Sequence, residues 1–151
     1  MVPKFRGRNI ETGEWVYGHL FYFNDGRHFI SPTGTDVVGG YGGAPSKYRL
    51  ENLVCFEINP ETVGQSTGLK DKNGVEIFEG DLVKITVSNG FDHLEDALSI
   101  VKEAKYHSGL ICELLSNTLE YRIFDEEATG YQYEVVGNFY ENPELLEPTN
   151  E

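Results

Sequence analysis

The chain has 151 residues, enough for one domain or two very small ones. An apolar content of 39% and an aromatic content of 13% exclude a disordered chain, and no apolar run approaches the roughly 20 residues that cross a bilayer. The net charge of −13 would repel phosphate, so we expect neither nucleic acid nor a membrane as a direct partner.

The acidic excess lies entirely in the second half of the chain. Residues 1–75 contain eight basic and eight acidic residues, whereas residues 76–151 contain four basic and seventeen acidic residues. This distribution is typical of a solvated acidic face, and it also suits a basic protein partner. The N-terminus has no apolar signal segment and the chain has only two cysteines, Cys55 and Cys112, so we expect a cytoplasmic protein with reduced thiols.

The first part of the chain predicts β-strands separated by turns. EWVYGHLFYF follows Gly13 and is rich in aromatic and β-branched residues, RHFISPTG gives a second strand, and RLENLVCFEI gives a third, around residues 53–56. Residues 34–48 are glycine-rich and predict a long loop. This loop lacks the Gly-Lys-Ser/Thr ending of a phosphate-binding loop, so we expect it to fold over a neighbour or a partner.

Turn signals surround the clearest strand of the sequence. Asn59 followed by Pro60 predicts a short helical turn, and Asn73-Gly74 predicts a hairpin turn. EIFEGDLVKITV then predicts the strand, with Gly80-Asp81 at its start.

The region from residue 91 to residue 105 is compatible with a helix or a strand. We expect a short helical turn near residues 92–97, followed by a hairpin that turns at His107-Ser108-Gly109. LEYRIF and YQYEVVGNFY predict two more strands, joined by an acidic turn at residues 125–127. Asn142 and Pro143 predict a last helical turn, and residues 148–151 are expected to be frayed.

Three segments together resemble a known family. KFRG…TGEWVYG near the N-terminus, NPETVGQSTGLKDKNGVEIFEGDLV in the centre and EVVGNFYENPELL near the C-terminus are similar to the YopX family, small proteins usually encoded by bacteriophages and prophages. The resemblance implies a phage or prophage origin and a location in the bacterial host cytoplasm. It points to no particular activity, because the family has no established biochemical function; since the sequence contains no catalytic motif, we expect a non-enzymatic protein without a cofactor.

The resemblance also implies a mainly β fold: an SH3-like β-barrel with an additional N-terminal β-region and short helical turns. We expect the N-terminal β-region to span residues 1–58 and the SH3-like barrel region to span residues 59–147. The two regions are expected to pack as one compact unit.

No catalytic residue, metal ligand or cofactor-binding residue is predicted. The carboxylates Asp71, Glu76, Glu79 and Asp81 lack the spacing of a calcium loop, and such short side chains more often accept backbone hydrogen bonds in turns. We therefore assign Asn73, Gly74, Gly80 and Asp81 to a structural turn motif. Valine in place of either glycine should destabilise the fold, and Asp71→Asn should matter much less.

Histidine and cysteine residues give no firmer catalytic candidate. His19 is expected to be a partly buried packing residue in the first aromatic strand, and Cys112 a small core residue. His107 with Cys112 forms a conceivable nucleophile pair only if the fold brings the two together.

The aromatic residues of the first half favour a binding surface as well as a core. Alternate side chains of one strand cannot all face the same core, and Tyr and Trp are common in protein interfaces. Four residues are therefore predicted to contact a partner: Trp15, Tyr17, Tyr41 and Tyr48.

Three functions remain open on the sequence alone. The first is a non-enzymatic module that binds a protein partner or a second copy of itself, as a homo-oligomer. The second is an acidic nucleic-acid mimic that occupies a host protein. The third is a metal-dependent enzyme using Asp71, Glu79 and Asp81, or a Cys/His enzyme.

Overall fold

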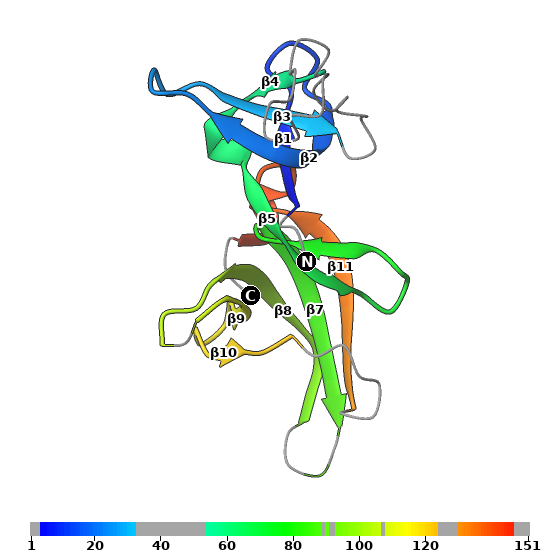
Figure 1. Cartoon of the computed structure of the whole chain (residues 1–151). Coiled ribbons are helices and arrows are strands. Elements are labelled where there is room, and N and C mark those ends of the chain that lie inside the picture. The colour runs from blue at the N-terminus through cyan, green and yellow to red at the C-terminus, as the bar shows by residue number, and fades with distance from the viewer. Residues whose placement is uncertain are drawn as a thin grey trace, which may run out of the picture. The chain divides into compact units, whose positions relative to one another are not determined.

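The computed structural model describes residues 4–32, 54–88, 90, 93–106, 108–123 and 130–146 (Figure 1). These residues are mainly β, as expected, and the strands pair in antiparallel sheets. Several predicted segments lie outside the described residues: the glycine-rich loop 34–48, the acidic turn 125–127 and the tail 148–151.

The chain divides into two compact units, Met1–Gln65 and Ser66–Glu151. The sequence placed this boundary between residues 58 and 59. The short segment after residue 58 joins the first unit because it bonds to the first strand: the Arg8 N–H donates to Thr62 Oγ1 over 2.8 Å, and Arg6 pairs with Gly64.

The first unit consists of short strands and one helical turn. In chain order they are β1 (Phe5–Arg8), β2 (Trp15–Tyr22), β3 (His28–Pro32), β4 (Phe56–Ile58), the 3-10 turn η1 (Pro60–Thr62) and the start of β5 (Gly64–Lys70). The strands predicted after Gly13 and at RHFISPTG are confirmed. So is the helical turn, where the Asn59 side chain accepts a hydrogen bond from the Glu61 N–H.

The third predicted strand begins later than expected. Of the described residues that follow position 53, those at 56–58 pair with β3, so β4 starts at Phe56. The other edge of β4 is also bonded, because the Ile10 N–H donates to the Glu57 carbonyl and the Asn59 N–H donates to the Arg8 carbonyl. These bonds link β4 back to the end of β1, so the sheet has an inner and an outer side.

The inner side of the first sheet holds the apolar core of this unit. Ile30 and Ile58 are fully buried there. A side chain on Gly7 would collide with Ile58, since a Cβ atom at this position would lie 2.4 Å from the Ile58 Cδ1 atom. Gly7 therefore makes room for Ile58.

The second unit continues β5 and adds six strands and one turn. They are β6 (Glu76–Phe78), β7 (Asp81–Ser88), β8 (His93–Glu103), β9 (Leu110–Leu114), β10 (Glu120–Tyr121), β11 (Tyr131–Asn138) and the 3-10 turn η3 (Pro143–Leu146). Five of them form an open antiparallel sheet in the order β10-β9-β8-β7-β11. Among the described residues the strand pairs close no barrel.

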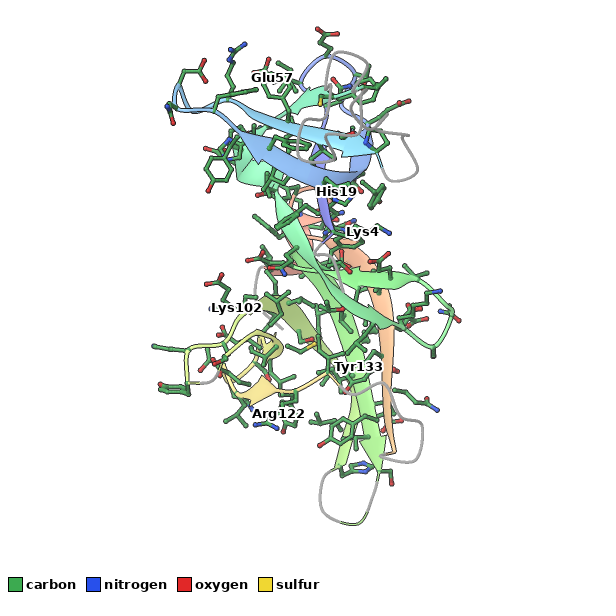
Figure 2. The ribbon with its side chains drawn as sticks, in the orientation of Figure 1. Lys4, His19, Glu57, Lys102, Arg122 and Tyr133 are labelled. Atoms are coloured by element: carbon green, nitrogen blue, oxygen red, sulfur yellow. The ribbon has the colours of Figure 1, made fainter. Side chains whose placement is uncertain are left out.

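The core of the second unit lies on one side of this sheet. It is formed by alternate residues of β7, β8, β9 and β11 with one residue of β6: Ile77, Val83, Ile85, Val101, Cys112, Leu114 and Tyr133. The labelled Tyr133 in Figure 2 also donates a hydrogen bond from its hydroxyl to the Arg122 carbonyl over 3.0 Å.

The helical turn predicted near residues 92–97 is wrong. Residues 93–103 form the single strand β8, which pairs with β7 and β9 on its two sides. A shift in the pairing with β7 accommodates Asp96, whose φ is 49°, and the Asp96 N–H donates to Thr86 Oγ1. Pairing on both sides outweighs a local capping pattern.

The remaining turns and strands agree with the sequence in most respects. Gly109, with a φ of 90°, closes the β8–β9 hairpin, and the Ala104 N–H donates to its carbonyl. β10 is shorter than LEYRIF predicted, with two paired residues. The last helical turn is confirmed, but the Asn142 side chain accepts from the Asn138 N–H instead of capping it.

Candidate protein-binding surface

The outer side of the first sheet carries a row of rings along β2. Alternate residues of a strand point to opposite sides, so Gly18 and Leu20 face inward while their neighbours face outward. We call the outward set the aromatic row: Trp15, Tyr17, His19, Phe21 and Phe23. Tyr17 is 41% exposed, Phe21 38% and Phe23 53%, whereas Trp15 is half-buried, so most of the row is open to solvent.

His19 lies in the middle of this row and is exposed (Figure 2). The sequence-based expectation that it is a partly buried packing residue is wrong. His19 lies between Gly18, which is buried, and Leu20, which is half-buried, and its own side chain points to the opposite, solvent-exposed side.

Arginine side chains stack on both ends of the row. The guanidinium carbons of Arg6 and Arg8 lie 4.7 Å and 5.9 Å from the centre of the Trp15 ring. At the other end, Arg27 lies 5.8 Å from the Phe23 ring centre. Arg6 is buried, but Arg27 is exposed, and Trp, Tyr and Arg are the residue types most enriched in the energetic centres of protein interfaces, so this surface has the composition of a binding site.

The turn beyond the row is held by its own charges. Asp25 accepts hydrogen bonds from the Arg27 N–H and from the Arg27 guanidinium, whose Nε lies 2.9 Å from Asp25 Oδ2. The backbone hydrogen bond from Arg27 is the main reason that the pKa of Asp25 lies below its usual value. Phe23 and Phe29 meet edge to face above this turn, with ring centres 5.2 Å apart.

A pocket of about 400 Å³ opens beside the first residues of the row. It lies where the β1–β2 turn, β2, the end of β3 and the start of β4 meet. Its lining combines aromatic and apolar side chains with polar groups of the turn: Asn9, Thr12, Glu14, Trp15, Val16, Tyr17, Pro32 and Phe56.

The structure brings two of the four predicted partner-binding residues together. Trp15 and Tyr17 lie two positions apart in the aromatic row and both line the pocket. Tyr41 and Tyr48 lie outside the described residues. Glu14 and Phe56 were not predicted as site residues, because no local pattern places residue 56 beside residues 14–17.

The predicted turn residues lie in two turns of the second unit. Gly74 has a φ of 82° and its N–H donates to the Asp71 carbonyl, whereas Asn73 is not in the left-handed region. Gly80 has a φ of 93°, and Asp81 is buried with its carboxylate accepting from the Phe78 N–H over 2.8 Å.

Asp71 is a three-way acceptor. Its Oδ1 atom accepts from the N–H groups of Asn73 and Val75, and its Oδ2 atom accepts from the Val135 N–H. It therefore ties the β5–β6 turn to β11, an attachment between residues 64 positions apart that the sequence did not reveal.

The described residues give no support to the two enzyme hypotheses. In this part of the chain no three His, Cys, Asp or Glu side chains come together as a metal-binding group. Cys112 is fully buried, and burial raises the pKa of its thiol to about 12, so it is protonated at neutral pH. His107, its suggested partner, lies outside the described residues. No helix among the described residues is long and apolar enough to cross a membrane.

Comparisons with known proteins agree with the sequence pattern. The model of one protein family, described as YopX protein, matches residues 4–147. One solved structure, the crystal structure of protein EF1440 from Enterococcus faecalis, is similar with a TM-score of 0.52 and 26% identity. That match covers 97% of this chain and 99% of that chain. None of the curated proteins compared with the chain matches it.

Proposed function

The chain belongs to the YopX protein family, and from this premise we propose that it is a non-enzymatic module that binds a protein partner through the outer side of its first sheet. The observation that carries the proposal is the aromatic row, in which Tyr17, Phe21 and Phe23 are all more than a third exposed. A cluster of exposed rings that the core does not need is costly in water and favours a surface that a partner covers.

The charges of the chain support the same surface. The first unit has six basic and seven acidic residues, a net −1, whereas the second has six basic and eighteen acidic residues, a net −12. Fully buried centres of interfaces are depleted in charge. The aromatic row itself contains no carboxylate, ammonium or guanidinium group, so it is better suited to a desolvated contact than the acidic second unit.

A photo-cross-linking experiment tests this function. The benzoyl-phenylalanine side chain is placed at Phe21, and a matched variant carries it at Leu119, which is 53% exposed in the second unit. After irradiation in the infected bacterial host, we expect one reproducible cross-linked species from the Phe21 variant and none from the Leu119 variant. Equal cross-linking at both positions, or none at Phe21, contradicts the proposal.

The cross-link also identifies the kind of partner. A species of twice the chain mass indicates that the partner is a second copy and that the protein is a homo-oligomer. A species of any other mass indicates a host or phage protein. We also propose that the protein acts in the cytoplasm of a bacterial host and is encoded by a phage or prophage; its membership of the YopX family supports this proposal.

An SH3-like barrel is our proposal for the second unit. Its support is the order of the strands, with the β7-β8-β9 meander and β11 on the other edge of β7. The β5–β6 turn adds two bonds to β11: the Lys72 N–H donates to the Tyr133 carbonyl, and the Val135 N–H donates to Asp71. Contacts between the first and last parts of the unit are expected where strands close into a small barrel.

The net −12 of the second unit favours one alternative function, an acidic mimic that occupies the nucleic-acid site of a host protein. This function requires competition with DNA. The mimic replaces our main proposal if a captured partner binds DNA and this chain displaces the DNA from that partner. In that case Phe21→Ser should leave the displacement unchanged.

A further inference from the structure

The pocket beside the aromatic row has the shape and lining of a site for one side chain of the partner. We propose that this pocket receives a single basic side chain, an arginine or a lysine, which enters with its apolar stem against the rings. This inference rests on the proposed function, because the ligand belongs to the protein that covers the first unit.

The size and apolar lining of the pocket fit a long side chain. Its volume of about 400 Å³ lies within the range of roughly 300–1,000 Å³ that is usual for ligand sites. Val16 and Pro32 supply aliphatic surface, and Tyr17 and Phe56 are 41% and 38% exposed. The methylene groups of an arginine or lysine stem bury well against such surfaces.

The rings of the pocket favour a cation at the end of that stem. The face of an aromatic ring is electronegative and attracts ammonium and guanidinium groups within about 6 Å. Trp15 already contacts the guanidinium groups of Arg6 and Arg8, which shows that this ring accepts cations within the chain. Tyr17 and Phe56 also line the pocket, and aromatic side chains are a common means of binding cationic groups.

Glu14 adds a formal negative charge to the pocket. The backbone of Glu14 is fixed in the β1–β2 turn, because its N–H donates to Thr12 Oγ1 and its carbonyl accepts from the Asn9 N–H. Its carboxylate has no hydrogen bond or ion pair with the described residues, so it can pair with an incoming cation.

Arg8 lies close to the pocket, but the described part of the structure shows no ion pair between it and Glu14. The Arg8 Nε donates to the Gly13 carbonyl over 2.9 Å, and its guanidinium stacks on Trp15. The net charge of −13 attracts a basic segment over a longer range and raises its association rate. We therefore expect a partner segment with an exposed arginine or lysine flanked by small or apolar residues.

Trp15 is the single tryptophan of the chain and lines the pocket, so its fluorescence reports binding there. The probe is the peptide acetyl-Gly-Arg-Gly-amide, and its control has citrulline in place of arginine, with the same shape and no charge. We expect a saturable change in emission with half-saturation at about 1 mM for the arginine peptide, and about tenfold weaker binding of the citrulline peptide.

Two variants separate the pocket from the charge of the whole chain. Glu14→Gln should weaken binding of the arginine peptide about fivefold or more. Glu95→Gln removes the same charge from an exposed position on β8 and should leave binding within about twofold of wild type. Equal losses in the two variants, an equal response to both peptides or no change in emission each overturn the inference.

The outcome can be told apart from failure of the proposed function. If the arginine peptide does not change the Trp15 emission but the Phe21 variant still cross-links to a partner, the outer side binds its partner by other chemistry. If the Phe21 variant forms no cross-link, the proposed function itself is contradicted.

Discussion

Asp71 joins segments that are far apart in the sequence. Its two carboxylate oxygens accept three backbone N–H groups, from Asn73, Val75 and Val135. Asparagine can place its oxygen toward the turn, but its amide nitrogen then faces the Val135 N–H. A buried donor left without an acceptor costs about 1–3 kcal/mol.

Asp71→Asn is therefore expected to lower the free energy of unfolding by about 1–3 kcal/mol in urea titrations, contrary to the sequence-based expectation of a small effect. Asp25→Asn is the matched control, since Asp25 also accepts turn hydrogen bonds but is exposed. The control should change stability by no more than about 0.5 kcal/mol. Equal effects of the two changes would show that the bond to Val135 contributes nothing.

Gly74 allows a clean test of backbone strain. A Cβ atom at this position would meet nothing within 4 Å, so any cost arises from the φ of 82°. We expect Gly74→Val to cost about 1–3 kcal/mol and Gly74→Asn clearly less, because asparagine tolerates the left-handed region. If both variants melted at the wild-type temperature, the turn would adopt another backbone conformation.

The Cys112 thiol makes stability depend on pH in the alkaline range. Its pKa is raised from 9.0 to about 12 in the folded protein, mainly by burial. As the pH rises, the thiol of the unfolded chain loses its proton before the thiol of the folded protein does. The stability that the protonated thiol contributes is therefore complete below pH 9.0 and is lost as the pH rises toward about 12. Wild type should lose up to about 1.4 kcal/mol per pH unit more than Cys112→Ala over this range, measured by urea unfolding. Parallel pH curves for the two proteins would contradict the assignment.

At the scale of elements, local patterns predicted the turns and most strands. Asn59-Pro60, Asn73-Gly74 and Gly109 act through their own backbone preferences, which a sequence displays directly. The prediction for residues 92–97 was wrong because the conformation of this segment depends on its pairing with β7 and β9. The pocket could not be predicted either, since it unites the turn before β2 with Phe56 on β4.

The irregular pairing of β8 provides a test of that explanation. Asp96 has a φ of 49°, and a β-branched residue is strongly disfavoured there, so Asp96→Val should cost about 1–2 kcal/mol. Glu95→Val changes the adjacent exposed position of the same strand and should change stability by less than about 0.5 kcal/mol. Chemical denaturation of both variants measures this difference. The explanation fails if Asp96→Val is as stable as Glu95→Val.

At the scale of the whole molecule, the acidic residues oppose folding by mutual repulsion. The second unit contains eighteen acidic and only six basic residues, so most of the excess negative charge lies there. Salt screens this repulsion, with a Debye length near 30 Å at 0.01 M and near 10 Å at 0.1 M. Sodium chloride should therefore raise the melting temperature by about 2–4 °C between these concentrations. A melting temperature that falls with salt would mean that attractive ion pairs dominate instead.

The close contact between Gly7 and Ile58 predicts which residues related proteins can carry at these two positions. Because a Cβ atom there would collide with Ile58, alanine at position 7 requires a shorter side chain at position 58. In relatives that keep this sheet, the two positions should covary: glycine accompanies a long aliphatic residue, and alanine accompanies a small one. Each single substitution alone destabilises the fold, by overpacking at position 7 or by a cavity at position 58, so the pair is expected to change together.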